Sequence, residues 1–180
     1  MGMRSDSTLK DLLVLIDGLG IEYKDLKMIE LGNQWLQAQK GQRMSGKVFF
    51  TQLGVKHISI DTNGLDGALP LDLCSDIDME GHGIEPADIV TNFGTSEHVV
   101  GQEACFRNVH NFCRVGGLMV HFVPPEGTWA RHGLYRYTVD FFDRLATQYK
   151  YKTVVNRLYE KAPYVGNRGL IFCALEKACP

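Results

Sequence analysis

Two histidines stand in polar segments where a side chain could exchange a proton with a reacting group. His98 follows an apolar run that ends near Thr91, and His132 lies in the segment after Pro124 and Pro125. The unperturbed pKa of imidazole is about 6.5, so a neutral ring can accept a proton near neutral pH. We therefore expect His98 or His132 to act as a proton acceptor. The alternative for His98 is a structural or capping role at the start of a helix, and the sequence leaves both open.

Three other histidines fit structural positions. His121 alternates with apolar neighbours in residues 118–123, so a buried, hydrogen-bonded ring is expected there. His57 and His110 are expected on the surface or on a helix. Along the sequence we find no cluster of carboxylates and histidines that would offer a metal site, and we expect no metal.

Two carboxylates, Glu30 and Asp61, follow short apolar runs, in positions where a strand would end, and a third candidate, Asp72, stands between Leu71 and Leu73. An ionised carboxylate has two acceptor oxygens, so one at the end of a strand can accept hydrogen bonds from both hydroxyls of a ribose. Each also has a simpler explanation. Glu30 could satisfy a helix N-terminus, Asp61 could form an Asx turn with Asn63, and Asp72 could be a surface acid.

A loop rich in proline, glycine and aromatic residues follows the apolar run 118–123. Residues 124–135 read P-P-E-G-T-W-A-R-H-G-L-Y. Large aromatic side chains in such a loop are typical of a substrate wall or lid, so Trp129 and Tyr135 are candidate substrate contacts, together with Glu97. The alternative is a surface loop whose Trp129 folds back onto the core.

Apolar periodicity predicts alternating strands and helices around these residues. The predicted strands are residues 27–31, 57–60, 87–91, 118–123, 152–158 and 170–175. The predicted helices are residues 9–19, 45–53, 105–113 and 141–149. Such alternation indicates an α/β fold in which helices cover both faces of a mostly parallel sheet, a three-layer Rossmann-like arrangement. Residues 34–44 are polar and receive no assignment.

The last two predicted strands are connected differently from the others. Only residues 159–169 separate them, which is too short for the helical crossover that parallel strands need. We therefore expect the two strands to pair as an antiparallel C-terminal hairpin, with its turn near residues 163–167.

The order of these segments resembles the class I, Rossmann-like S-adenosylmethionine-dependent methyltransferases. The resemblance is carried by E-L-G-N-Q at residues 30–34, Asp61, D-I-V-T-N-F-G-T-S-E-H-V at 88–99 and C-R-V-G-G-L-M-V at 113–120, and it spans residues 28–175. It implies a seven-stranded sheet and S-adenosylmethionine as cofactor. The cofactor contacts that it implies are Glu30, Gly32, Asn33, Gln34, Asp61, Thr62, Asp72, Leu73, Asn92, Phe93 and Gly94.

The chain departs from the family's loop pattern, Glu/Asp-x-Gly-x-Gly-x-Gly. Gln34 and Leu36 stand where the later glycines would be. Glycines there let backbone amides approach the cofactor and tolerate positive φ. Gln34 must therefore point away or become part of the pocket. The departure keeps a second hypothesis open, a non-catalytic, methyltransferase-like binding or regulatory module.

The resemblance implies in-line transfer of the sulfonium methyl group to a nucleophile, with the protein supplying orientation and exclusion of water. We expect a small-molecule acceptor, because a single domain over residues 1–180 leaves little material to recognise a macromolecule. An NAD-dependent oxidoreductase is a further alternative. It would favour a G-x-G-x-x-G loop and a parallel final strand.

Composition excludes several other classes of protein. The net charge of −2 and the pI near 6.3 give no long-range attraction to nucleic acid. The five cysteines contain no C-x-x-C pair, so reduced thiols are expected instead of disulfides or a zinc site. Neither a signal peptide nor a membrane-spanning run is apparent, and a cytoplasmic protein is expected. The sequence does not indicate an oligomeric state.

Overall fold

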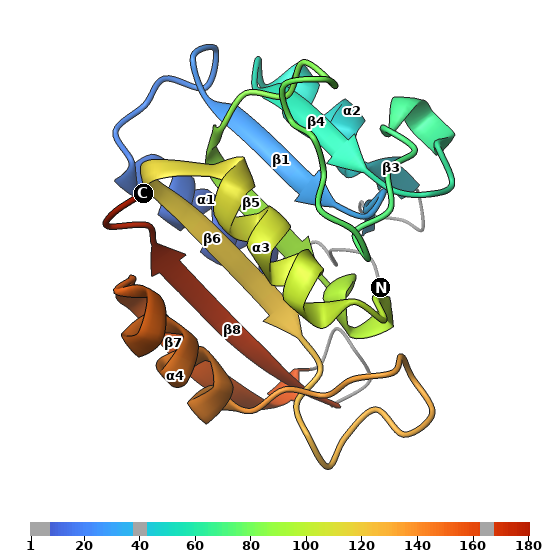
Figure 1. The fold of residues 1–180 in the computed structure, drawn as a ribbon, viewed down its shortest axis with the longest axis vertical. Helices are drawn as coiled ribbons and strands as arrows, with labels where there is room; N and C mark the ends of the chain where they lie inside the picture. Colours follow the sequence, from blue (N-terminus) through green and yellow to red (C-terminus); the bar gives the residue numbers. More distant parts are fainter. Residues whose placement is uncertain (1–7, 38–42, 163–167) are drawn as a thin grey trace.

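A six-stranded sheet forms the centre of the computed structural model, which describes residues 8–37, 43–162 and 168–180. The strand order is β4-β1-β5-β6-β8-β7 (Figure 1). The first four strands in this order are parallel, and β8 runs antiparallel to both β6 and β7. The strands are β1 Lys27–Leu31, β4 Lys56–Ile60, β5 Ala87–Phe93, β6 Cys113–Val123, β7 Lys152–Ala162 and β8 Arg168–Glu176.

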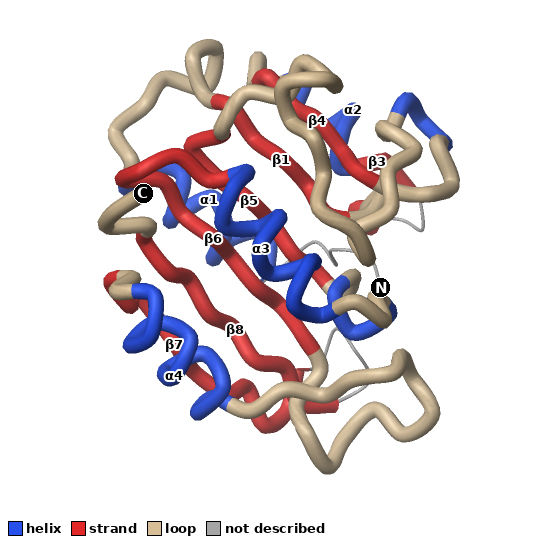
Figure 2. The backbone as a smooth tube through the Cα atoms, viewed as in Figure 1, coloured by secondary structure: helices blue, strands red, loops and turns tan. Residues whose placement is uncertain are grey.

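Helices cover both faces of this sheet and give three layers (Figure 2). The helices are α1 Thr8–Gly18, α2 Gly46–Gln52, α3 Gln102–Phe112 and α4 Val139–Tyr149. Leu12 of α1 and Phe50 of α2 pack in one core cluster, whereas Val109 of α3 and Phe142 of α4 pack in the other. Successive strand residues point to opposite faces, so each strand feeds both clusters. The predicted mostly parallel, three-layer α/β fold is confirmed.

The C-terminal hairpin is also confirmed, while the sheet differs in one respect from the family pattern. β7 and β8 pair antiparallel, and the expected turn at residues 163–167 lies outside the described residues. The resemblance implies seven strands, and this sheet has six. Beside β4, where a further strand could pair, there is a single parallel bridge between Ile60 and Leu69. Pro70 follows at once and has no N–H to continue a ladder, so the bridge does not extend into a strand.

The unassigned segment after β1 contributes a second, two-stranded sheet. β2 Trp35–Gln37 pairs antiparallel with β3 Arg43–Ser45, and residues 38–42 between them are not described. Ser45 then caps α2, because its Oγ accepts a hydrogen bond from the Val48 N–H at 3.2 Å. None of the helices in the described residues is long and apolar enough to cross a membrane.

Candidate functional site

A cavity of about 470 Å³ opens beyond the C-terminal ends of β1, β4 and β5. In an open α/β sheet, ligands bind at this edge, where the loops after neighbouring strands converge. Loops after all three strands form the wall. The lining residues are Gly32, Asn33, Gln34, Trp35, Ile60, Asp61, Thr62, Leu71, Asp72, Leu73, Cys74, Gly94, Thr95, His98 and Val99.

Most of the predicted cofactor contacts lie together in this wall. Those that line it are Gly32, Asn33, Gln34, Asp61, Thr62, Asp72, Leu73 and Gly94, and His98 lies with them. Glu30, Asn92 and Phe93 do not line it, because their side chains are buried in the sheet below. Lining residues that sequence reasoning missed include Thr95 and Val99, although both lie inside the segment 88–99 that it singled out.

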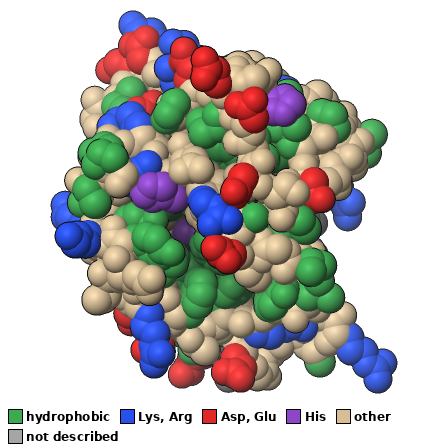
Figure 3. Space-filling view, in the orientation of Figure 1, with side chains coloured by type: hydrophobic (Ala, Val, Ile, Leu, Met, Phe, Trp, Pro, Cys, Tyr) green, Lys and Arg blue, Asp and Glu red, His purple; other side chains and the backbone are tan. Residues whose placement is uncertain are grey.

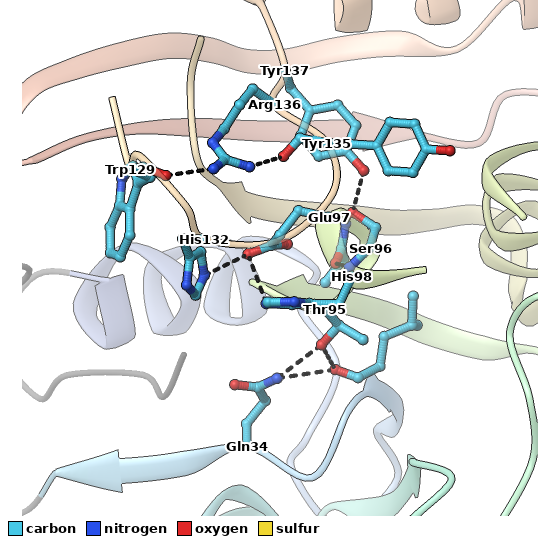
Figure 4. Close-up of polar contacts among 12 residues, drawn as sticks. Gln34, Thr95, Ser96, Glu97, His98, Trp129, His132, Tyr135, Arg136 and Tyr137 are labelled. Atoms are coloured by element: carbon cyan, nitrogen blue, oxygen red, sulfur yellow. Dashed lines mark hydrogen bonds and ion pairs between the residues drawn. The ribbon is translucent and has the colours of Figure 1, made fainter. Parts of the chain in front are cut away.

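Gln34 has become part of the cavity wall and joins two of its loops. Its Nε2 donates to the Thr95 Oγ1 at 2.9 Å and to the Leu31 carbonyl at 3.2 Å (Figure 4). Thr95 in turn donates to the same carbonyl at 2.7 Å. Gly32 stands beside this bridge with φ +80, and a Cβ there would lie 2.5 Å from Thr95 Oγ1. The loop therefore depends on one glycine, and the Gln34 side chain fixes its position.

Asp61 is already used by the loops and still faces the cavity. Its Oδ2 accepts the Asn33 N–H at 2.8 Å, and its Oδ1 accepts the Asn63 N–H at 3.0 Å. The second bond is the Asx turn that the sequence suggested. A carboxylate has about four acceptor sites, so two remain for a ligand. The Asx turn and a ligand role are therefore compatible.

Glu97, His98 and His132 form a cluster at the rim of the cavity, contrary to the expectation that no such group exists (Figure 4). Glu97 Oε1 lies 3.5 Å from His132 Nε2 and 3.9 Å from His98 Nε2. The Glu97 side chain is fully buried, whereas the His98 side chain is 47% exposed. Burial raises the pKa of Glu97 to about 7 and lowers the pKa of both histidines, which favours neutral rings.

The loop at residues 124–137 brings His132 to this cluster. Trp129 is 8% exposed and donates from Nε1 to the Gly169 carbonyl at 2.7 Å, so it folds back onto the core and anchors the loop. The Leu134 N–H bonds the Glu97 carbonyl at 2.7 Å. Gly133, with φ +66, lies so close to the Glu97 side chain that a Cβ on residue 133 would be 2.8 Å from Glu97 Cγ. Neither Trp129 nor Tyr135, whose hydroxyl bonds the Val100 carbonyl, lines the cavity.

Solved structures with a similar fold include several methyltransferases. Burkholderia thailandensis 1,6-didemethyltoxoflavin-N1-methyltransferase, with bound 1,6-didemethyltoxoflavin and S-adenosylhomocysteine, has a TM-score of 0.65 and 12% identity, and the match covers 93% of this chain and 76% of that one. A TehB-like methyltransferase from Corynebacterium glutamicum has a TM-score of 0.56 and 14% identity over 91% and 85% of the chains. The trans-methyltransferase CalH, in complex with S-adenosylhomocysteine, has a TM-score of 0.59 and 15% identity. The match covers 91% of this chain and 55% of that one. No protein-family model and no curated protein sequence matches the chain.

The chain has the fold of class I S-adenosylmethionine-dependent methyltransferases. The hairpin of β7 and β8 at the end of a parallel sheet belongs to this methyltransferase fold. Residues 30–34, which resemble the family's loop after the first strand, run from inside the sheet to the cavity wall.

Glu30 supports the loop of the methyltransferase fold from below. Its Oε1 accepts the Gln34 N–H at 3.0 Å, and its Oε2 lies 3.6 Å from His57 Nε2. Burial raises the pKa of Glu30. The expectation that His57 lies on the surface is wrong, because its side chain is fully buried and stacks on Phe50, with 5.8 Å between ring centroids.

Asn92 holds the turn that carries the cluster. Its Oδ1 accepts the Ser96 N–H at 3.0 Å, so its Nδ2 is the donor to His121 Nδ1, also at 3.0 Å. His121 is 1% exposed, as expected for a buried, hydrogen-bonded ring. Tyr137 adds a bond from its hydroxyl to the Ser96 Oγ at 2.8 Å. The role of Tyr137 was not foreseen, because nothing in the sequence links the two segments.

A second cavity, of about 450 Å³, lies between α3 and α4. Phe106, Met119, Phe141 and Leu175 are among its lining residues, with His121 at its wall. Figure 3 shows hydrophobic side chains gathered on this face of the molecule. It is separate from the edge of the sheet where the three loops converge, so the first cavity is the candidate active site.

Proposed function

We propose that this protein transfers the methyl group of S-adenosylmethionine to a small-molecule acceptor. One observation carries the proposal: the cavity at the C-terminal ends of β1, β4 and β5 combines the carboxylates Asp61 and Asp72 with a histidine, His98, at its rim. The fold supports it, since two of the similar solved structures contain S-adenosylhomocysteine. The five cysteines are free thiols, which fits a protein that functions in the reducing cytoplasm.

The residues of the cavity fit this cofactor. The volume of the cavity, about 470 Å³, lies in the range of small-molecule sites. We assign Asp61 and Thr62 to the ribose hydroxyls, because the carboxylate keeps unused acceptor sites. Asp72 and Leu73 would contact the adenine. The remaining cofactor contacts fall to Gly32, Asn33, Gln34 and Gly94.

The cofactor supplies an activated methyl group on a positively charged sulfur, so the protein has little covalent chemistry to do. The wall formed by Gln34 and Thr95 orients the ligand from one side. The loop anchored by Trp129 brings His132 to the Glu97 carboxylate at the rim. A neutral His98 or His132 ring accepts the proton of an acceptor that arrives protonated. Orientation and proton removal are therefore the contributions of this chain.

Replacement of Asp61 by alanine tests the ribose assignment. We expect Asp61→Ala to weaken binding of S-adenosylhomocysteine at least about tenfold, because hydrogen bonds to a charged acceptor contribute about 1.5–3 kcal/mol each. Isothermal titration calorimetry on folded protein measures the change.

Asp25→Ala is the matched control for this experiment. Asp25 is an exposed aspartate that precedes β1, at the opposite end of the strand from the cavity. Its replacement is expected to leave the affinity unchanged. Equal affinities of the Asp61→Ala variant and the parent chain would remove Asp61 from the cofactor site.

A non-catalytic binding module is the second candidate function, and Gln34 is the observation that favours it. The side chain occupies the place of a glycine and is tied to Thr95 across the loop. Such a module would bind S-adenosylhomocysteine and release no product with any acceptor. A screen of small acceptors with S-adenosylmethionine, read as formation of S-adenosylhomocysteine, separates the two functions.

A further inference from the structure

We propose that Glu97, His98 and His132 bind a divalent first-row transition metal ion, with Zn²⁺ as the best match. Two imidazoles and one carboxylate suit Zn²⁺ and its neighbours in the first transition row, and they suit Ca²⁺ or Mg²⁺ poorly. The three side chains come from the turn after β5 and from the loop after β6. Metal binding itself does not depend on the proposed function, although the role given to the ion below rests on it.

The candidate ligand atoms already lie close together. One atom from each of the three side chains lies within 4.8 Å of the others. Figure 4 shows both imidazole rings directed at the Glu97 carboxylate, at the 3.5 and 3.9 Å separations given above. Bonds of about 2.0–2.2 Å around a tetrahedral ion place its ligand atoms roughly 3.3–3.5 Å apart. The separations of 3.5 Å and 3.9 Å, and of at most 4.8 Å between any two of the atoms, must therefore shorten, by about 1 Å for the widest pair, when an ion binds.

The Glu97 carboxylate is the strongest sign that something is bound there. Its side chain is fully buried, and neither oxygen has a hydrogen-bond partner in any other residue that the structure describes. The same holds for the His132 Nε2. Burying a polar group without a partner is costly. A cation between the carboxylate and the two rings would satisfy these atoms together.

Backbone hydrogen bonds hold together the two segments that carry the cluster. The Leu134 and Tyr135 N–H groups both bond the Glu97 carbonyl, at 2.7 and 3.1 Å. The side chain of Asn92 accepts a hydrogen bond from the backbone N–H of Ser96, the residue before Glu97, and so fixes the position of Ser96. These bonds fix the backbone that carries the three side chains, as a preorganised site requires. Three protein ligands also leave a coordination position open, which is typical of catalytic and not of structural zinc.

The open position defines the class of acceptor, if the proposed function holds. His98 also lines the cofactor cavity, so the ion lies at its rim. An acceptor hydroxyl bound to the ion loses its proton to solvent more easily, because the metal lowers the pKa of bound oxygen. That oxygen then forms the new C–O bond to the methyl group while the C–S bond breaks, and neutral S-adenosylhomocysteine leaves. The site therefore selects a small alcohol or phenol, and with the ion bound His98 and His132 act as ligands.

Titration of the EDTA-treated chain with Zn²⁺ tests the site. We expect one ion per chain, with a dissociation constant of about 1 µM or tighter. Glu97→Gln and His132→Gln should each weaken binding at least about 100-fold, since each removes a ligand. Co²⁺ should give visible absorption bands with the parent chain, and these bands should be lost in both variants. Circular dichroism shows whether each variant is folded.

Two controls exclude binding elsewhere. His82→Ala removes an exposed histidine that lies far from the cluster. Its neighbour Gly83 lines a shallow pocket with Lys27 and Ala87, at the end of the strands opposite to the cofactor cavity. Cys179→Ser removes a partly exposed thiol that does not line the cavity. Both should bind Zn²⁺ as the parent does. Absence of binding, or equal affinity in the Glu97→Gln variant, would overturn the proposal.

Titration with S-adenosylhomocysteine in metal-free buffer separates this proposal from the proposed function. If the cofactor product binds and Zn²⁺ does not, the metal site is wrong and the methyltransferase proposal stands. If Zn²⁺ binds in the cluster and S-adenosylhomocysteine does not bind, the metal site stands and its role in methyl transfer is wrong.

Discussion

The His98→Ala variant is expected to lower turnover about 100-fold while the affinity for S-adenosylhomocysteine changes little. The His98 ring lies at the cavity rim beside a buried carboxylate, and no side-chain capping bond is found for the short helical turn Ser96–His98 that contains it. Loss of the ring therefore removes a proton acceptor or a metal ligand, with little effect on the rest of the fold. The measurement is formation of S-adenosylhomocysteine with an acceptor found by screening.

His82→Ala is the matched control for this variant, and its turnover is expected to equal that of the parent. Added imidazole gives a second readout, because a small base can enter the space left by a half-exposed side chain. Partial recovery of the His98→Ala rate by imidazole indicates proton transfer, and recovery by excess Zn²⁺ indicates a weakened metal site. A folded His98→Ala protein with normal turnover would leave orientation as the main contribution of the site.

Stability should fall by about 3 kcal/mol between pH 7 and pH 4 because of His121 alone. Burial between α3 and α4 lowers the pKa of His121 to about 3, against about 6.5 in an unfolded chain. As the pH falls below 6.5, the unfolded chain takes up this proton first, so the equilibrium shifts toward unfolding. The contribution of neutral His121 to the free energy of unfolding is complete above pH 6.5, and it is lost progressively as the pH falls toward 3.

The groups around His121 leave burial as the cause of its shifted pKa. Asn92 on β5 bonds Nδ1, and the rings of Phe106 and Phe142 pack against it from α3 and α4. Cys173, its partner on β8, has a raised pKa and stays neutral over this range. None of these neighbours carries a charge.

Urea unfolding of the parent and of His121→Gln at several pH values isolates this contribution. Glutamine is neutral throughout, so the variant should lose less stability than the parent as the pH falls. The stability difference between the two proteins should therefore shrink by about 3 kcal/mol from pH 7 to pH 4. A constant difference would mean that His121 takes up its proton at the same pH in the folded protein as in the unfolded chain.

Periodic and local features of the fold could be predicted from the sequence. The apolar runs of β5 and β6 mark strands that are buried on both faces, and the short link between the last two strands predicts their antiparallel pairing. Residues that directly follow strands, such as Asp61 and Gly94, also fell in the cavity wall as expected. The end of each strand positions these residues, so their place follows from the topology.

Contacts between distant segments could not be predicted. His132 meets Glu97 only because Trp129 anchors a long loop against Gly169, and no pattern in the sequence relates these residues. The His57 side chain, expected on the surface or on a helix, is buried on β4, because α2 covers it with Phe50. The unassigned residues after Gln34 contribute β2, which pairs with β3 across residues that the structure does not describe. In each case packing between elements, and not local propensity, decides the position.

Binding of S-adenosylhomocysteine to the purified chain tests the central claim most directly. Calorimetry is expected to give one molecule per chain, with a dissociation constant of about 100 µM or tighter, and NAD⁺ is expected to give no binding heat. Addition of S-adenosylhomocysteine should also raise the melting temperature, because the ligand binds only the folded state. Failure to bind S-adenosylhomocysteine, or tighter binding of NAD⁺, would contradict the assignment of the cavity to S-adenosylmethionine.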